Sequence, residues 1–385
     1  MYSTGHRATS PPDMPSARVT GEDVTLRPVR ADDIDGITRA CQDPETQRHL
    51  YRLPSPYTTS HAEAFVTGRA ATAWRGGLAE WTIADPQDDR YLGSLGVSRV
   101  DWDPGVAGLD CLVAPWARGH RLAARAVTAA TDFVFHHGIG RVEVRVAPDN
   151  IAGQRTALAA GFQREAQLRS AVRDRTGRRV SQLLYSRIHG DPAGPIRSRL
   201  PDLPDGGLSD GVVRIRPRRP GDVDALFALE NHEDVWTRSV PPVPPDRETV
   251  DASCRFGAAA NWLDGVQAAM VITDAQTGDV EGQISLHVFS PELGEAMLSY
   301  SLTPQARGKG YTTRAVRMVS RWAFEVGFDR LVAGTAVDNT ASQRVLERTG
   351  FTREGVERSR LPGVGGSRVD TVSWSLLPKD LSWTS

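Results

Sequence analysis

The chain has 385 residues, which is too long for one ordinary hydrophobic core and suggests about two or three domains. With 39% hydrophobic and 24% charged residues and a net charge of -1, it has the composition of a globular protein and no basic field that would attract nucleic acid or an anionic membrane. No apolar run approaches the ~20 residues that cross a bilayer. Its three cysteines form no CxxC pair, which is typical of reduced thiols in a cytoplasmic protein and indicates neither a disulfide framework nor a metal site.

The chain begins with a segment, residues 1–19, that is rich in Ser, Pro and Thr and has no hydrophobic stretch, so we expect a disordered tail. An internal repeat follows. One constant spacing of 189 residues (216 minus 27, for example) predicts two copies of one fold in tandem. The matching motifs are Leu26-Arg27-Pro28 and Ile215-Arg216-Pro217, Arg118-Gly119 and Arg307-Gly308, Asp149-Asn150 and Asp338-Asn339, and Gly161-Phe162 and Gly350-Phe351.

A stretch rich in proline and glycine, without a periodic apolar pattern, separates the two copies. Such composition is typical of a linker. We therefore predict domains at residues 20–189 and 211–385, joined by a linker at 190–210.

The secondary structure is clearest in the second copy, and the first copy repeats its order. Strands and helices are mixed without a regular βαβ alternation, which predicts an α+β fold. In chain order we predict a strand at 212–217, a short helix that begins after Asp222, antiparallel strands at 281–288 and 296–302, a helix at 311–326 with Trp322 on its buried side, a strand at 331–337, a helix at 340–348, and two last strands that flank residues 362–367.

A glycine-rich loop joins the strand that ends at Leu302 to the helix that begins at Tyr311. Glycines let the main chain approach a phosphate closely, and the free N–H groups and dipole of a helix start attract an anion. A bare Gly-x-Gly turn is a weak signal, because tight turns use the same residues. The loop reads Gln305-Ala306-Arg307-Gly308-Lys309-Gly310.

Together with Asn339-x-x-Ser342 and Gly350-Phe351, this loop resembles the GNAT superfamily of N-acetyltransferases. The Leu-Arg-Pro motif near the start of each copy is similar to the branch that contains the ribosomal-protein N-terminal acetyltransferases. The resemblance covers nearly the whole of each half. It implies two tandem GNAT folds, each a mixed, mostly antiparallel, splayed sheet flanked by helices.

The resemblance also implies that acetyl-CoA is the cosubstrate, with its pyrophosphate on the loop amides and its pantetheine between two splayed strands, and that no metal is needed. The residues implied to bind acetyl-CoA are Leu302, Gln305, Ala306, Arg307, Gly308, Lys309, Gly310, Tyr311, Thr312, Asn339 and Ser342.

Transfer of an acyl group to an amine needs a base for the amine proton and an acid for the departing thiolate. The resemblance implies that Ser342 lies near the sulfur and protonates it, although a serine in a first helical turn is often only a cap. Glu295 and Tyr300 are candidates for the base or for a polar contact on the strand before the loop.

Three more carboxylates, Glu230, Glu233 and Asp234, fall in the helix-to-loop region that lines the acceptor site in the family. They could hold a cationic substrate. Exposed surface charge is the alternative interpretation.

The first copy departs from the motif. An arginine in place of the last loop glycine crowds a pyrophosphate, or needs a φ that favours glycine. We therefore expect the first copy to be impaired in, or incapable of, acetyl-CoA turnover. In the alternative, an adapted loop holds the phosphates with Arg118 and Arg121. The changes are Trp116 for Gln305, Arg121 for Gly310 and Gly153 for Ser342.

The sequence thus predicts a cytoplasmic N-acetyltransferase that moves an acetyl group from acetyl-CoA to the primary amine of a peptide, a protein N-terminus or a small molecule, mainly in its second domain. Neither nucleic acid nor membrane is expected as a partner, and the oligomeric state stays open. In one alternative the first domain is a non-catalytic pseudo-enzyme that serves as a substrate-binding or structural partner. In another the protein is an acyl-CoA-binding sensor.

Overall fold

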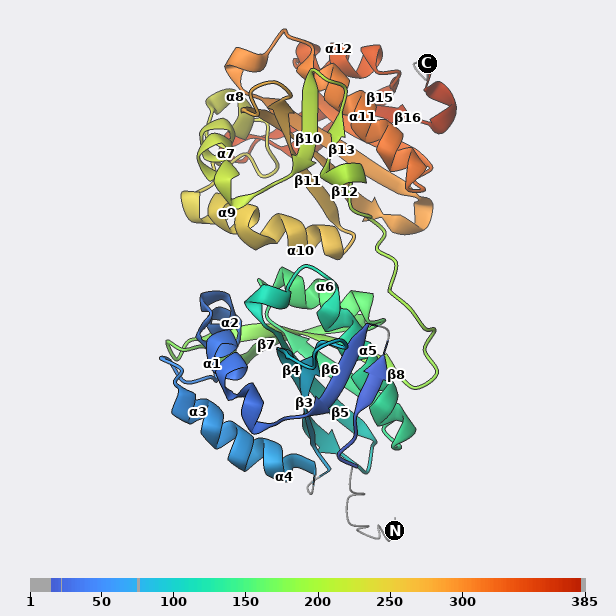
Figure 1. The fold of residues 1–385 in the computed structure, drawn as a ribbon. Helices are drawn as coiled ribbons and strands as arrows, with labels where there is room; N and C mark the ends of the chain where they lie inside the picture. The colour runs from blue at the N-terminus through green and yellow to red at the C-terminus, as the bar shows by residue number, and fades with distance from the viewer. Residues whose placement is uncertain (1–14, 22, 75–76, 382–385) are drawn as a thin grey trace, which may run out of the picture. The chain divides into compact units, whose positions relative to one another are not determined.

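The computed structural model of the protein describes residues 15–21, 23–74 and 77–381. Within that part the chain divides into two compact units, with the boundary between Arg197 and Ser198. Each unit has its own sheet and its own hydrophobic core (Figure 1). Residues 1–14, the larger part of the predicted tail, lie outside the described residues.

The second unit is built around one mixed sheet with the strand order β15-β16-β14-β13-β12-β11-β10-β9. Every neighbouring pair is antiparallel except the central pair β13 and β14, which is parallel. The α+β prediction is therefore confirmed. The strands are β9 (Leu208–Ser209), β10 (Val213–Pro217), β11 (Gln267–Asp274), β12 (Val280–Ser290), β13 (Glu295–Leu302), β14 (Arg330–Ala336), β15 (Thr352–Pro362) and β16 (Arg368–Leu376).

Helices cover both faces of this sheet. One face carries α7 and α9, which pack around Leu226, Val250 and Val271, and the other carries α11 (Figure 1). The helices are α7 (Val223–Glu230), α8 (Glu233–Trp236), α9 (Arg247–Ala252), α10 (Ala258–Leu263), α11 (Tyr311–Glu325) and α12 (Thr340–Arg348).

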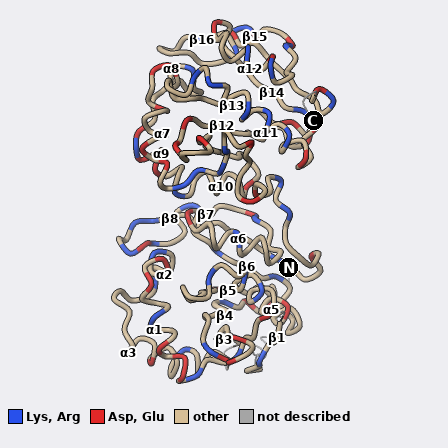
Figure 2. Tube along the Cα trace, turned by 45° about the horizontal axis from the view of Figure 1, so that its top comes forward, with Lys and Arg blue, Asp and Glu red and all other residues tan. Residues whose placement is uncertain are grey.

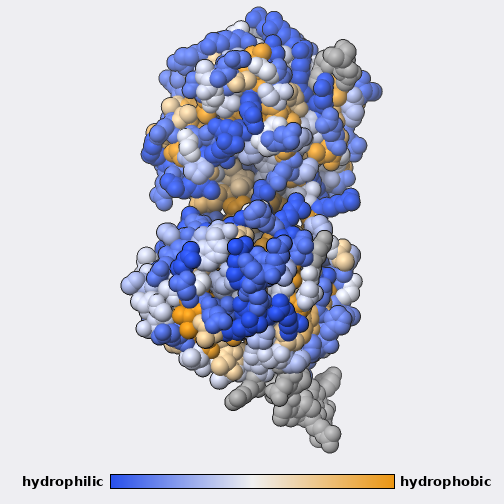
Figure 3. Space-filling model, viewed as in Figure 1, coloured by the Kyte–Doolittle hydropathy of each residue, from blue (hydrophilic) through white to orange (hydrophobic). Residues whose placement is uncertain are grey.

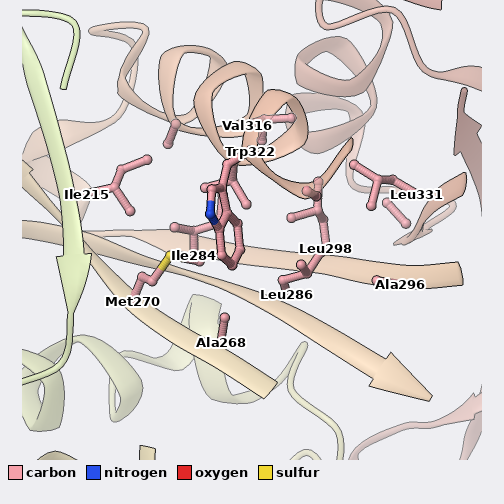
Figure 4. Packing of buried hydrophobic residues seen from close by; sticks show 14 of the residues in the cluster. Ile215, Ala268, Met270, Ile284, Leu286, Ala296, Leu298, Val316, Trp322 and Leu331 are labelled. Atoms are coloured by element: carbon pink, nitrogen blue, oxygen red, sulfur yellow. The ribbon is translucent and has the colours of Figure 1, made fainter. Parts of the chain in front are cut away.

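The main core of the second unit lies between α11 and the sheet. Trp322 projects from α11 toward the strands among Ile284, Leu286 and Met270, as Figure 4 shows, and is 2% exposed. Such a side chain removes a large apolar area from water, so it stabilises the packing of α11 against the sheet. The helical spacing that predicted Trp322 as a core residue is confirmed.

Strand alternation then decides which side chains of β12 face the opposite side. Ile284 and Leu286 lie in the α11 core, so Gln283, Ser285 and His287 point to the face that carries α7. A polar row on a face that is covered by a helix needs partners, and this row leads to the candidate site.

The first unit repeats the same plan. Its strand order is β1-β2-β3-β4-β5-β6-β8-β7, and only β5 and β6 are parallel. Its strands are β1 (Val19–Gly21), β2 (Val24–Pro28), β3 (Ala79–Ala84), β4 (Tyr91–Asp101), β5 (Val106–Val113), β6 (Arg141–Val146), β7 (Gln163–Arg173) and β8 (Arg179–Ile188). Its α-helices are α1 (Ile34–Gln42), α2 (Pro44–His49), α3 (Thr59–Ala64), α4 (Ala71–Ala73), α5 (Leu122–His136) and α6 (Ile151–Ala159).

Part of the stretch that was expected to be a linker is structured. Leu200 and Leu203 are buried in the core of the second unit, and the Trp262 indole donates to the Leu200 carbonyl at 2.9 Å. Strand β9 also lies inside 190–210. Residues 198–210 therefore form part of the second unit, because their apolar side chains complete its core.

The surface of each unit is polar and mixed in charge. Acidic and basic residues are interspersed along both units (Figure 2), and the visible surface is mostly hydrophilic with scattered hydrophobic residues (Figure 3). In the part of the chain that the structure describes, no helix is both long enough and apolar enough to span a bilayer.

Each unit contains the same buried ion pair next to its first long strand. Arg27 and Asp33 form two hydrogen bonds of 2.9 and 2.8 Å, and Arg216 and Asp222 form two of 2.8 Å. Burial raises the pKa of Asp33, but hydrogen bonds from Arg27, from the Arg30 N–H and from Thr82 outweigh it and hold the pKa below its ordinary value. The Asp33 carboxylate therefore stabilises the fold at neutral pH, and this contribution is lost as the pH falls through its lowered pKa.

Asp33→Asn should lower the free energy of unfolding of the first unit by about 1–3 kcal/mol, because it removes the buried carboxylate that accepts two hydrogen bonds from Arg27 and leaves that guanidinium only Asp89, 3.2 Å from its Nε. Hydrogen exchange of amides in β2 and β3 measures this change. The matched control, Asp35→Asn, alters a carboxylate that is 84% exposed and should leave exchange unchanged. Equal exchange in both variants would contradict the role of the pair.

Candidate active site

The site begins where the two parallel strands at the centre of the second sheet part. β13 and β14 pair only from Glu295–Met297 to Arg330–Val332, although both strands continue beyond. Past this point the facing main-chain groups of the two strands no longer bond to each other. Buried backbone N–H and C=O groups need hydrogen-bond partners. The opening therefore offers unpaired backbone groups that an extended ligand can bond.

The glycine loop directly follows the parted end of β13. Gly308 has φ +78° and Gly310 has φ +80°, a left-handed conformation that glycine adopts without steric cost. A Cβ built at either residue would meet nothing within 4 Å, so the space in front of the loop is open. The first amides of α11 have no acceptor within the helix. The loop thus fits a pyrophosphate group.

Ionic and hydrogen bonds hold the two ends of this loop. Arg307 donates to Asp234 on α8 at 2.8 Å, and the Tyr311 hydroxyl donates to Asp274 at the end of β11. Ala306 is fully buried, whereas Gln305 and Lys309 are exposed, and Thr312 lies half-buried in the first turn of α11. The predicted binding residues from Leu302 to Thr312 are therefore contiguous around the loop.

Two hydroxyl groups meet beside the opening. The Asn339 side chain accepts from the Ser342 N–H at 3.2 Å, so Asn339 is the cap of α12. The Ser342 hydroxyl instead lies 2.8 Å from the Tyr300 hydroxyl. Burial raises the pKa of Tyr300 to about 12, so its phenol keeps its proton at neutral pH. Tyr300 and Ser342 are thus brought together as a pair of hydrogen-bonded hydroxyl groups.

Glu295 is not brought to this site. It starts β13, seven residues before Leu302, which at a rise of ~3.3 Å per residue is ~23 Å from the loop. Its carboxylate lies 2.9 Å from the Arg330 Nε. Strand alternation puts Glu295 on the same face as Met297, but it does not fix how far along the strand Glu295 lies from the loop. The ion pair with Arg330 also occupies the Glu295 carboxylate.

A polar network lies on the α7 side of the sheet. Arg218 donates to Glu230 at 3.0 Å, to Ser253 at 3.1 Å and to Gln283, whose amide donates to Ser301 at 3.1 Å. Glu230 is therefore neutralised by an ion pair, and Asp234 likewise by Arg307. Two of the three carboxylates expected to hold a cationic substrate therefore form ion pairs within the protein. Of the three, Glu233 is exposed and forms no ion pair with the described residues.

Next to this network, the His287 ring Nε2 lies 2.8 Å from the Ser299 hydroxyl. Burial, and then the nearby Arg218 charge, lower the pKa of His287 below its ordinary value, so the ring is neutral at pH 7. Sequence reasoning missed both residues. The alternation of polar and apolar residues along β12 was the signal that could have placed His287 on the polar face.

The first unit keeps the backbone of the site. β5 and β6 pair only from Val106–Gly108 to Arg141–Glu143, and Gly119 has φ +91°. Arg121 adopts φ 55° and ψ 16°, close to the φ 80° and ψ 5° of Gly310. The loop conformation is therefore retained, and Arg121 carries the strain of a left-handed residue that a glycine would not.

The loop side chains of the first unit have partners inside the protein. Trp116 donates to the Tyr91 carbonyl at 3.3 Å and lies under the Arg39 guanidinium. Arg118 pairs with Asp43 at 2.6 Å. Arg118, one of the two arginines considered for holding phosphates, is thus already engaged.

The first unit also lacks the hydroxyl pair. Cys111 and Gly153 stand where Tyr300 and Ser342 stand in the second unit. A Cβ at residue 153 would lie 2.9 Å from Val146 Cγ1, so this turn cannot take a serine without a shift.

The polar network is replaced as well. Val29, Cys41 and Leu112 take the places of Arg218, Glu230 and Ser301, and all three belong to an apolar cluster. The positions that form the polar network in the second unit are therefore apolar in the first.

Comparison with known proteins agrees with this geometry. The family described as "Acetyltransferase (GNAT) domain" matches residues 23–163 and 213–352. These two matches cover more than half of the chain, so the chain belongs to the GNAT acetyltransferase family and carries two of its domains.

Individual relatives are more distant. The chain is 34% identical over 119 residues to a Bacillus subtilis (strain 168) protein named as a ribosomal N-acetyltransferase, YdaF, covering 31% of this chain and 62% of that protein. It therefore spans less than two thirds of this relative. It is 26% identical over 177 residues to the N-acetyltransferase p20 of Bacillus licheniformis, covering 45% and 97%. Among solved structures, Mycobacterium smegmatis RimJ in complex with CoA-disulfide has 25% identity and a TM-score of 0.40, covering 45% of this chain and 85% of that one.

Arg121→Gly should raise the free energy of unfolding of the first unit by roughly 0.5–1 kcal/mol, because the left-handed cost of about 1–2 kcal/mol is removed and partly offset by the greater freedom of glycine. Hydrogen exchange of amides in α5 reports the change. Arg118→Gly, at an extended residue that pairs with Asp43, should instead lower stability. A loss in both variants would show that the Arg121 side chain matters more than its backbone.

Proposed function

We propose that the protein is an acetyl-CoA-dependent N-acetyltransferase whose second domain transfers the acetyl group to a primary amine. One observation carries this proposal: the opening between β13 and β14 leads from the left-handed Gly308 and Gly310 loop to the Tyr300 and Ser342 hydroxyl pair. This succession of a loop suited to an anion, an opening for an extended ligand and a hydroxyl pair supports the proposal.

Acetyl-CoA supplies an acetyl thioester when bound. The loop amides and the charge of Lys309 hold its pyrophosphate, and the unpaired main chain of β13 up to Leu302 orients the rest. Arg307 is paired with Asp234 and fixes the loop. Ser342 gives its proton to the departing sulfur and is reprotonated by Tyr300, which stays a phenol at neutral pH.

The acceptor is a primary amine that enters from the α7 side of the sheet. The relative named as a ribosomal N-acetyltransferase supports a peptide or protein N-terminus over a small amine. The pairing of Glu230 with Arg218 also supports this choice, because little free negative charge is left to bind a polycationic small molecule. The three free cysteines are in keeping with a cytoplasmic location.

The first domain serves as a non-catalytic partner. It lacks both hydroxyl groups, and residues of the apolar cluster around Tyr57 and Tyr91 take the places of the polar network. The hairpin between β7 and β8 is also bonded to the end of α2 and the loop after it, since Arg175 donates to the carbonyls of residues 47, 50 and 53. The residue at the place of Arg175 in the second domain is Val364, whose side chain cannot donate a hydrogen bond.

Gly308→Trp should abolish thiol release from acetyl-CoA with a panel of amines and peptides, because the indole fills the anion cradle. The matched variant Gly119→Trp should leave the rate nearly unchanged, because it alters the loop that is not used. Product mass spectrometry identifies the acetylated acceptor. The opposite pattern would move the chemistry to the first domain.

Ser342→Ala should lower kcat by about 10²-fold with little change in KM, since it removes the proton donor and leaves the Asn339 cap intact. Steady-state kinetics of thiol release gives both constants. The control, Ser342→Thr, retains the hydroxyl and should be much less affected. An unchanged kcat in Ser342→Ala would reduce this serine to a structural role.

A further inference from the structure

The proposed reaction needs a proton acceptor for the amine, and Glu295 is not free for this role, because it lies in the paired stretch of β13 and its carboxylate is held by Arg330. We propose that His287 accepts this proton by way of the Ser299 hydroxyl. This inference rests on the proposed function and names the base of that same site.

The two side chains lie where the acceptor amine has to be. Ser299 follows Met297, the last residue of β13 that pairs with β14, by two positions, so it lies at the parted stretch and on the α7 face. Its side chain is exposed, whereas His287 on the neighbouring strand β12 is half-buried behind it. The 2.8 Å contact between Nε2 and the hydroxyl oxygen joins the two. Ser299 is thus the group that an incoming amine meets, and His287 is the group behind it.

The surroundings of His287 keep its ring neutral, so the ring can accept a proton. The Glu230 carboxylate is paired with Arg218, so it is not free to stabilise a protonated ring at rest. Arg218 also disfavours a second positive charge. The groups next to His287 are Gln267 from β11, Met297 and Ser299 from β13, and the Arg218 charge after β10, which is in turn held by Glu230 from α7 and Ser253 after α9.

The proton balance is as follows. As the bond forms between the amine nitrogen and the thioester carbonyl carbon, the amine proton passes to the Ser299 oxygen, and the Ser299 proton passes to His287 Nε2. The carbon–sulfur bond breaks, and the sulfur takes the Ser342 proton. The His287 proton then leaves to solvent, and Tyr300 and Ser342 are reprotonated from it, so no other reactant is needed.

The first domain supports the assignment by contrast. At the same spacing of 189 residues, Ser98 stands in place of His287 and Asp110 in place of Ser299. The pair is therefore present only in the domain that also has the Tyr300 and Ser342 hydroxyls.

The first test uses the protein without acetyl-CoA. NMR titration of the nine histidine rings in the full chain, with His287→Gln to assign the signal, should show a His287 pKa below 6.5. Ser299→Ala should change this pKa, because the hydroxyl partner is lost. A His287 pKa at or above 6.5, or one that Ser299→Ala leaves unmoved, would overturn the proposal.

The second test separates the base from the proposed function. His287→Gln should lower kcat/KM by about 10²-fold while acetyl-CoA affinity, measured by calorimetry, stays unchanged. Ser299→Ala should lose less, because water can bridge the gap, and Ser98→Ala in the first domain should lose nothing. In the wild type the fall of kcat/KM with decreasing pH should steepen below the His287 pKa, since both the amine and the ring must then lose protons. This steepening should vanish in His287→Gln.

Full activity and an unchanged pH profile in His287→Gln, in an enzyme that Gly308→Trp inactivates, would overturn the base and leave the proposed function standing. Loss of acetyl-CoA affinity in His287→Gln would also overturn it. No turnover by the wild type with any amine would overturn the proposed function and this inference with it.

Discussion

The separation of two parallel strands at the centre of the sheet is the constraint on which the rest of the site depends. β13 and β14 bond over three residues and then part, which leaves main-chain groups that a ligand must satisfy. Because β13 runs on to Leu302, the glycine loop and the start of α11 come at the open end. The side chains of β13 then fall alternately on the α11 face, where Tyr300 reaches Ser342, and on the α7 face, where Ser299 meets His287.

The duplication separates what the fold requires from what the chemistry requires. Both units keep the buried arginine–aspartate pair, the parted strands and the left-handed loop, including an Arg121 that tolerates a glycine conformation. They differ in the side chains that line the opening. Hydroxyls and a buried ion-pair network in the second unit are replaced by Cys111, Gly153 and an apolar cluster in the first. The two units thus share the backbone of the site but not its polar side chains.

Sequence reasoning predicted the fold well, because strands and helices with one buried face have a clear period. The helix at 340–348 was predicted with the bounds of α12, and the loop between Leu302 and Tyr311 was predicted from its glycines. Sequence reasoning failed for residues whose place in the site depends on the pairing of strands far apart in the sequence. Glu295 has the right chemistry but lies at the wrong end of its strand, and His287 gains its role only from Ser299 on the neighbouring strand. Strand β11 was not predicted, since a continuous buried run shows no alternation.

The central claim is that one of two similar folds in this chain holds acetyl-CoA for chemistry. Native mass spectrometry of the full chain, titrated with acetyl-CoA, counts the bound copies directly. A single bound copy, absent when Gly308 is replaced by Trp, is the result that this account predicts. Two tightly bound copies, or one that survives that replacement, would contradict it.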